Sequence, residues 1–136
     1  MKQILVDSGP LIALFDRSDA HHERSRSFLR DNPSRLVTTL ASVTEVLHLL
    51  NFSAAAQADF LHWISLGGLQ LASIDPPDFP RLEALVQKYS DLPMDFADAC
   101  LVLIAERTGI RDIATIDRDF SIYRIHGRSR FNVVLK

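Results

Sequence analysis

This sequence is poor in the features that mark secreted, membrane-spanning and strongly charged proteins. It contains 1 Cys in 136 residues, so it cannot form an internal disulfide. No apolar run reaches the roughly 18–20 residues that a membrane-spanning helix needs. Asp7 follows Met1 too soon for a signal peptide, so we expect a cytoplasmic location. The formal net charge of -2 gives no general attraction for nucleic acid.

The remaining composition is that of an ordinary globular protein. Hydrophobic residues make up 47% of the chain and charged residues 24%. The sequence has no evident linker, low-complexity segment or internal repeat. Its length is sufficient for one hydrophobic core, so we expect a single domain over residues 1–136.

Short apolar segments alternate with amphipathic segments along the chain. We predict strands at residues 3–6, 36–39, 69–74, 112–116 and 132–135. Helices are predicted at about residues 10–15, 20–29, 41–50, 54–66, 77–89 and 95–108, with Asp19 and Ser53 as N-caps. Strands that alternate with helices predict an α/β fold with a mainly parallel sheet of four to five strands.

Acidic residues lie beside these apolar segments. Asp7 and Asp117 each follow a predicted strand, and parallel sheets bind ligands at the carboxyl ends of their strands. Clustered carboxylates repel one another and resist losing water, and a hard cation offsets that cost. Oxygen ligands without Cys or His favour Mg²⁺ or Mn²⁺, which indicates metal-dependent phosphoryl transfer. The six acids are Asp7, Glu45, Asp95, Asp98, Asp117 and Asp119.

Each acid also has a purely structural interpretation. Asp95 and Asp98 can be the N-cap and the N3 acid of the helix at 95–108. Capping explains Asp95 well but Asp98 less well, because a cap does not need the small alanines on both sides of Asp98. Asp7 can be only a helix cap, Glu45 a solvated side chain, and Asp117 a turn residue after a strand.

Arginines are concentrated in two stretches of the chain. One interpretation is contact with a phosphate backbone beside an acidic centre, and the other is a solvated helix face and a solvated tail. The earlier stretch holds Arg24, Arg26, Arg30 and Arg35, and the later one adds Lys136 to its arginines. We predict substrate binding for Arg118, Arg124, Arg128 and Arg130.

Four stretches taken together resemble the PIN-domain ribonucleases, in particular the VapC-type toxins of bacterial toxin–antitoxin pairs. The stretches are Ile4-Leu5-Val6-Asp7-Ser8, Ser42-Val43-Thr44-Glu45-Val46, Asp95-Phe96-Ala97-Asp98-Ala99 and Thr115-Ile116-Asp117-Arg118-Asp119-Phe120. Their order, their spacing and the total length all fit, so the resemblance spans essentially the whole chain. It implies a PIN-like three-layer α/β/α fold.

The same resemblance implies an Mg²⁺- or Mn²⁺-dependent endoribonuclease. A shallow acidic crevice needs an exposed strand, so we expect single-stranded or looped RNA as the substrate. The resemblance also implies a cognate antitoxin and a homodimer as partners, and no membrane. Gly9 departs from many relatives, which carry Ser or Asn there, so the orientation of Asp7 can differ. The implied metal-binding and catalytic residues are Asp7, Glu45, Asp98 and Asp117, with Asp95 and Asp119 as supporting acids and Ser8 and Thr115 as orienting groups.

Three alternatives remain open to test. One is a metal-dependent phosphatase, although Gly9 stands where haloacid-dehalogenase-type phosphatases usually carry a second Asp. Another is a catalytically degenerate PIN-like module that binds RNA or a protein partner. The third is a receiver-like signalling domain, which needs a late lysine after a strand. Lys2, Lys88 and Lys136 do not stand at such a position.

Overall fold

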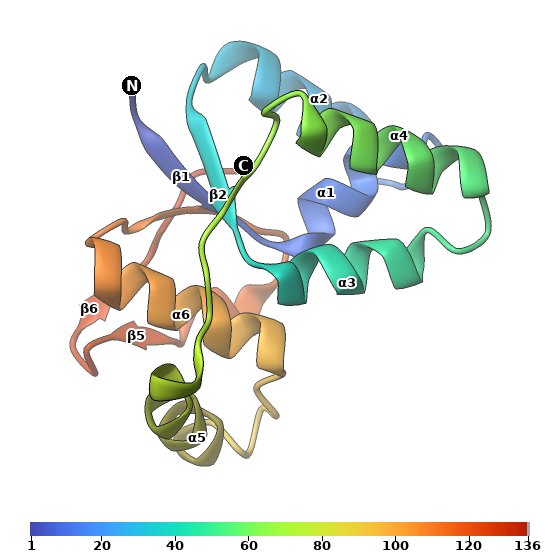
Figure 1. Ribbon diagram of the computed structural model, residues 1–136. Helices are drawn as coiled ribbons and strands as arrows, with labels where there is room; N and C mark the ends of the chain where they lie inside the picture. Colours follow the sequence, from blue (N-terminus) through green and yellow to red (C-terminus); the bar gives the residue numbers. More distant parts are fainter. Residues whose placement is uncertain (136) are drawn as a thin grey trace.

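A five-stranded sheet forms the centre of the computed structural model, which describes residues 1–135 (Figure 1). Its order is β3-β2-β1-β4-β7, and every neighbouring pair is parallel. This confirms the predicted α/β fold with a mainly parallel sheet. The strands are β1 (Gln3–Val6), β2 (Arg35–Thr38), β3 (Gln70–Leu71), β4 (Asp112–Ala114) and β7 (Asn132–Val133).

Helices cover both faces of this sheet. In Figure 1, α5 and α6 lie on one side of it, and α1, α2 and α4 lie on the other. The helices are α1 (Ser8–Phe15), α2 (His22–Asp31), α3 (Leu40–Leu49), α4 (Ala54–Ser65), α5 (Phe79–Lys88) and α6 (Phe96–Thr108), and the turn η1 (Pro76–Asp78) precedes α5.

The alternation of side chains along β1 explains the two covered faces. Leu5 is fully buried in the core with α5 and α6, whereas Ile4 and Val6 belong to the core on the opposite face. Successive side chains of a strand point to opposite faces, so a strand with no exposed face reads as a continuous apolar run. The three layers implied by the resemblance are therefore present.

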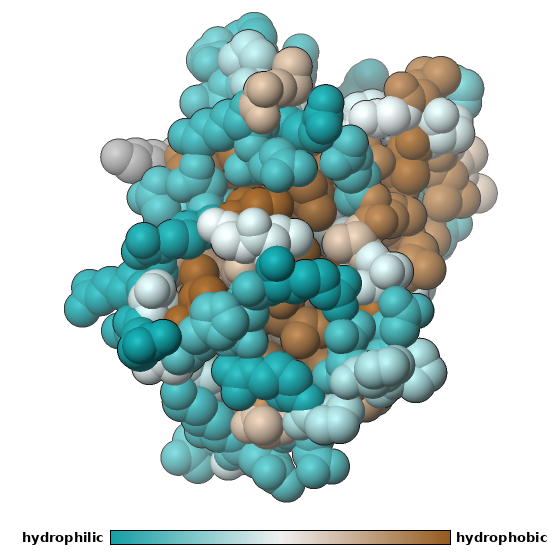
Figure 2. Space-filling view, turned by 60° about the vertical axis from the view of Figure 1, so that its left-hand side comes forward, coloured by the Kyte–Doolittle hydropathy of each residue, from teal (hydrophilic) through white to brown (hydrophobic). Residues whose placement is uncertain are grey.

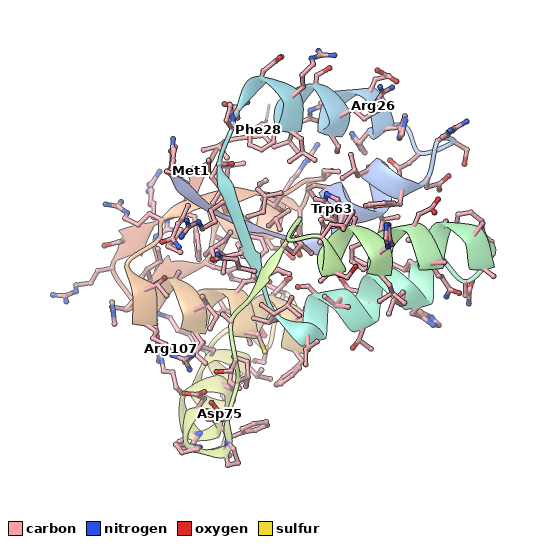
Figure 3. All side chains as sticks on the ribbon, turned by 45° about the horizontal axis from the view of Figure 1, so that its top comes forward. Met1, Arg26, Phe28, Trp63, Asp75 and Arg107 are labelled. Atoms are coloured by element: carbon pink, nitrogen blue, oxygen red, sulfur yellow. The ribbon has the colours of Figure 1, made fainter. Side chains whose placement is uncertain are left out.

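An aromatic cluster packs α4 against α1. The Phe15 ring lies 5.4 Å from that of Phe60 and 5.5 Å from that of Trp63. Figure 3 shows Trp63 on the side of α4 that faces α1. Since Phe15 ends α1, these contacts anchor the far end of the helix that Asp7 begins.

Several local predictions differ from the structure. The strands predicted over 112–116 and 132–135 end at Ala114 and Val133, and two other predictions differ more. Asp19 is not the N-cap of the second helix: α2 begins at His22, and the Asp19 carboxylate instead accepts the His21 N–H (2.8 Å) in the preceding turn. The strand predicted over 69–74 is reduced to β3, because that edge strand pairs with β2 alone. The predicted cap Ser53 is confirmed, since its hydroxyl accepts the Ala56 N–H at 3.1 Å.

The late part of the chain adds a small antiparallel hairpin that we did not predict. It consists of β5 (Arg124–Ile125) and β6 (Ser129–Arg130). Its turn contains His126 and Gly127 with φ of 53° and 69°. Positive φ is common for glycine but not for histidine. Gly127 alone therefore indicated a turn, whereas His126 did not.

One face of the molecule is mainly hydrophilic, with hydrophobic residues gathered toward its right-hand edge (Figure 2). Over residues 1–135, every helix is too short or too polar to cross a bilayer. Lys136, which we grouped with the later arginines, lies outside the described residues.

Candidate metal centre

The candidate site lies at the carboxyl edge of the sheet, between β1 and β4. Strand order changes direction at this pair, because β2 and β3 extend from one side of β1 while β4 and β7 extend from the other. Asp7 directly follows β1, and its N–H donates to the Ala114 carbonyl at the end of β4 (3.0 Å). Open parallel sheets bind ligands at such a switch point. In Figure 1 the starts of α1, α3 and α6 approach this edge.

Three carboxylates converge at this edge. Asp7, Asp98 and Asp117 each offer one oxygen, and these oxygens all lie within 4.8 Å of one another. Asp7 is 4% exposed and Asp98 is 5% exposed, whereas Asp117 is open to solvent. Within residues 1–135, no Lys or Arg forms an ion pair with any of the three. Their negative charge therefore has no cationic partner in the described part of the chain.

Asp7 is held by donors on both of its oxygens. Its Oδ1 accepts the Ser8 N–H (2.8 Å), and its Oδ2 accepts the Thr115 hydroxyl (2.8 Å). Burial raises the pKa of Asp7 from 3.8 to about 6. The two hydrogen bonds oppose that shift, while the charges of Asp117 and Glu45 add to it. The orienting role implied for Thr115 thus corresponds to a direct contact.

Asp98 comes from the first turn of α6. The Asp95 carboxylate caps this helix by accepting the Asp98 N–H (2.8 Å), so capping accounts for Asp95, as expected. The Oδ2 atom of Asp98 accepts the hydroxyl of Tyr123 (2.9 Å). Burial, followed by the charges of Asp7 and Asp95, raises the pKa of Asp98 to about 8. The neutral form of Asp98 is therefore favoured unless positive charge reaches the site.

Asp117 begins the turn η2 (Arg118–Ser121). Its Oδ1 accepts the Asp119 N–H (2.9 Å), and its own N–H donates to the Thr115 hydroxyl (3.0 Å). Thr115 therefore links Asp117 to Asp7. Asp119 lies outside the group of three, although burial and the charges of Asp117 and Asp95 raise its pKa.

Glu45 lies on α3 next to the group of three carboxylates but is not part of it. The Ser8 hydroxyl donates to Glu45 Oε1, while the Ser8 N–H donates to Asp7. Ser8 thus contacts both acids, through its N–H and its hydroxyl. Glu45 is half-buried and contributes to the raised pKa of Asp7 through its charge.

A groove of about 760 Å³ opens beside the acids. Its lining is mainly apolar, and three of its hydrophobic side chains are largely exposed: Leu40 (65%), Phe79 (50%) and Phe96 (47%). Glu45 and Asp95 also line it, so the groove is continuous with the acidic residues.

The four arginines predicted to bind substrate are dispersed. Arg118 is exposed and adjoins Asp117. Arg124 binds neighbouring backbone: one of its guanidinium nitrogens donates to the three carbonyls of residues 121–123 at 2.7–3.1 Å. The carbonyl of Arg130 accepts from Arg111 at the opposite end of β4 from Asp117. Arg128 lies in the turn of the same β5–β6 hairpin.

That hairpin packs beside the far end of α6. The His126 N–H donates to Glu106 (2.7 Å), eight residues beyond Asp98 on the helix. At about 1.5 Å per residue this is roughly 12 Å along the axis. The hairpin arginines are therefore attached to the opposite end of α6 from the acids.

Tyr123 is the site residue that sequence reasoning missed. It is fully buried and lies 25 positions from Asp98, so no local spacing connects the two. A weak signal was present, because it stands in the segment Phe120-Ser121-Ile122-Tyr123 directly after the acidic turn. A buried tyrosine usually needs a partner for its hydroxyl.

Comparison with known proteins shows the family and the fold of this chain. Ribonuclease VapC26 from Mycobacterium tuberculosis (strain ATCC 25618 / H37Rv) is 28% identical over 134 residues, covering 96% of this chain and 99% of the relative. The crystal structure of Mycobacterium tuberculosis VapC20, a sarcin–ricin loop cleaving toxin, superposes with a TM-score of 0.78 at 20% identity, over 88% of this chain and 93% of that one. The family model of the PIN domain matches residues 4–125. The chain therefore belongs to the PIN domain family.

Proposed function

We propose that this protein is an endoribonuclease of the VapC type that depends on a divalent cation, Mg²⁺ or Mn²⁺. The observation that carries the proposal is the convergence of Asp7, Asp98 and Asp117 within 4.8 Å at the switch point of the sheet. Membership of the PIN domain family and the similarity to a ribonuclease along nearly the whole chain support the reaction class.

The chemistry of the three acids fits a hard cation. Two of the carboxylates are almost fully buried, and burial raises the pKa of both. Such groups gain most from positive charge nearby, and oxygen-only ligands suit Mg²⁺ and Mn²⁺. When bound, a divalent cation supplies a polarised water and charge compensation at the phosphodiester.

The remaining roles follow from burial and position. Asp7, Asp98 and Asp117 would hold the cation, two of them as buried carboxylates and Asp117 as an exposed one. Either Asp98 or Asp117 would accept the attacking water's proton, and we assign this role to Asp117 because its side chain is exposed. Glu45 acts from the neighbouring helix through Ser8, and Asp95 caps the helix that carries Asp98. Asp119 supports the site through its backbone N–H, which donates to the Asp117 carboxylate.

A cleavage assay tests the reaction class. The protein is incubated with an end-labelled single-stranded RNA oligomer in Mn²⁺, in Mg²⁺ and in excess chelator. We expect cleavage only with a cation, and none by the Asp98→Asn variant. A simple phosphate ester is assayed in parallel, because hydrolysis of the ester but not the RNA indicates the phosphatase. Binding of RNA without any cleavage indicates the degenerate module.

We infer two protein partners, a cognate antitoxin and a second copy of the chain. The mainly apolar groove with exposed Leu40, Phe79 and Phe96 supports a protein contact beside the acids. Co-expression with the product of the adjacent gene tests for an antitoxin, and light scattering of the purified chain tests for a dimer. Because cellular RNA is the inferred substrate, we expect the protein to act in the cytoplasm.

A further inference from the structure

Among the described residues, Asp98 accepts one side-chain hydrogen bond. Within residues 1–135, the Tyr123 hydroxyl is the side-chain donor to this carboxylate, at 2.9 Å from Oδ2. Both side chains are buried, with 0% exposure for Tyr123 and 5% for Asp98. A buried carboxylate oxygen without a donor loses the compensation that water gives it elsewhere. This hydroxyl is therefore in a position to decide how the carboxylate is oriented.

The position of this hydroxyl is set by contacts that do not involve Asp98. The Tyr123 ring packs edge-on against Tyr89 and Phe120, with centroids 5.0 Å away in both cases. Phe120 in turn packs edge-on against Phe131 (5.4 Å). The Tyr123 N–H donates to the Asp119 carbonyl (3.0 Å). The hydroxyl is thus presented to Asp98 by a packed aromatic cluster.

The segment 117–123 connects two of the three converging carboxylates. Asp117 stands at its start and contributes an oxygen to the cluster, and Tyr123 stands at its end and contacts Asp98. Asp98 itself belongs to α6, a separate element. The bond from Tyr123 is therefore a direct link between the turn that carries one acid and the helix that carries another.

We propose that Tyr123 is a positioning residue for the metal centre: its hydroxyl holds Asp98 Oδ2 and thereby fixes the orientation of this carboxylate relative to Asp7 and Asp117. This proposal rests on the proposed function only in requiring that the site binds a divalent cation. Partners that orient a metal-binding side chain typically contribute about 10–100-fold in metal affinity.

The test compares two tyrosine-to-phenylalanine variants. Tyr123→Phe removes the hydroxyl and retains the ring in its cluster. Tyr89→Phe is the matched control, because its ring packs on Tyr123 while its hydroxyl accepts the Arg124 N–H (3.0 Å) instead of contacting Asp98. Mn²⁺ affinity is measured by calorimetry, and RNA cleavage is measured over a range of Mn²⁺ concentrations.

We expect Tyr123→Phe to weaken Mn²⁺ binding by about 10–100-fold and Tyr89→Phe to leave it unchanged. Cleavage by Tyr123→Phe should approach the parental rate at saturating Mn²⁺, since the carboxylates remain. A double variant tests the link directly: once Asp98→Ala has removed the carboxylate, adding Tyr123→Phe should weaken Mn²⁺ binding no further.

Several outcomes overturn the proposal. Equal Mn²⁺ affinity in the parent and Tyr123→Phe removes the positioning role and leaves the proposed function intact. If both phenylalanine variants lose the same Mn²⁺ affinity, the Tyr123 hydroxyl serves the stability of the fold and not the metal centre. The same conclusion follows if Tyr123→Phe unfolds at the assay temperature. If the parent protein binds no Mn²⁺, the result contradicts the proposed function itself, and with it the role of Tyr123.

Discussion

Asp7 and Asp98 are almost equally buried, but the structure holds them in different ways. Asp7 stands at the edge of the sheet, and donors occupy both of its oxygens. Asp98 stands on α6 and accepts from the Tyr123 hydroxyl alone among the described side chains. Burial raises the pKa of Asp7 to about 6 and, with the charges of Asp7 and Asp95, that of Asp98 to about 8.

This difference shows that neighbouring charges and hydrogen-bond donors, and not burial alone, set the pKa of a buried acid. Donors to an ionised carboxylate stabilise its charge and offset the cost of lost water. The sheet half of the site, formed by Asp7, Ser8 and Thr115, is thus prepared for negative charge before a cation binds. The helix half, formed by Asp95, Asp98 and Tyr123, accepts full charge only when positive charge arrives.

Removal of one acid from either half should give the largest effect. We expect Asp7→Asn and Asp98→Asn each to reduce Mn²⁺-dependent RNA cleavage by more than the roughly 10–100-fold typical of losing a supporting hydrogen bond. Without metal, both variants should melt at or above the parental temperature, because each removes a charge that the fold disfavours. The gain should be larger for Asp98→Asn. Melting far below the parent would instead make these acids structural.

The pH dependence of stability should show the two halves separately. Since both pKa values exceed the ordinary 3.8, the folded protein retains protons that the unfolded chain has released. The metal-free unfolding free energy should therefore fall as pH rises from about 4 to about 8. Asp98→Asn should remove the fall above about pH 6 and part of the fall below it, whereas Asp7→Asn should remove only part of the fall below about pH 6. Melting curves at a series of pH values, in chelator, measure this.

Mn²⁺ should reverse that trend, because cation binding requires ionised carboxylates. Its stabilising effect should grow as pH rises over the same range. A melting temperature that falls equally with and without Mn²⁺ would contradict a metal centre built on these acids.

Glu45→Gln should have a smaller effect than loss of either buried acid. The variant keeps an oxygen for the Ser8 hydroxyl and removes only a charge beside the cluster. In the parent, Mn²⁺ at a hundredfold excess over its dissociation constant should stabilise the fold by about 2.7 kcal/mol. Glu45→Gln should reduce that gain without abolishing it. A Mn²⁺-induced melting shift identical to the parent would leave Glu45 outside the metal centre.

The sequence was informative where a local pattern has one physical cause. The apolar run 3–6 followed by Asp7 predicted both β1 and its acidic edge, because strands buried on both faces read as continuous apolar runs. Ser53 and Asp95 were found as caps because capping is a short-range interaction. The convergence of Asp7, Asp98 and Asp117 was implied by the family resemblance and by the rule for parallel strand ends.

Long-range contacts that leave no periodic pattern in the sequence could not be predicted from it. The bond between Tyr123 and Asp98 joins residues 25 apart through the packing of an aromatic cluster. Similarly, the turn of the β5–β6 hairpin is held by the contact from His126 to Glu106, which no alternation in its sequence indicates. Consequently the dispersal of the predicted substrate-binding arginines could not be foreseen from their proximity in the chain.

That dispersal leads to the smallest predicted effect, which separates the site edge from the hairpin. Arg118 is exposed beside Asp117, whereas Arg128 and Arg130 belong to the hairpin at the far end of α6. We expect Arg118→Ala to weaken RNA binding modestly and to flatten the slope of log affinity against log salt by roughly 0.7, the value for one single-strand phosphate contact. The paired Arg128→Ala, Arg130→Ala variant is the control and should leave the slope unchanged. Binding is measured in excess chelator, so that cleavage does not interfere. It is measured at several salt concentrations and with RNAs of different sequence.

Because phosphate contacts carry no base information, the loss of RNA affinity from Arg118→Ala should be similar for every RNA. A flattened slope in the hairpin variant alone would move the substrate path away from the metal centre and onto the β5–β6 side of the molecule.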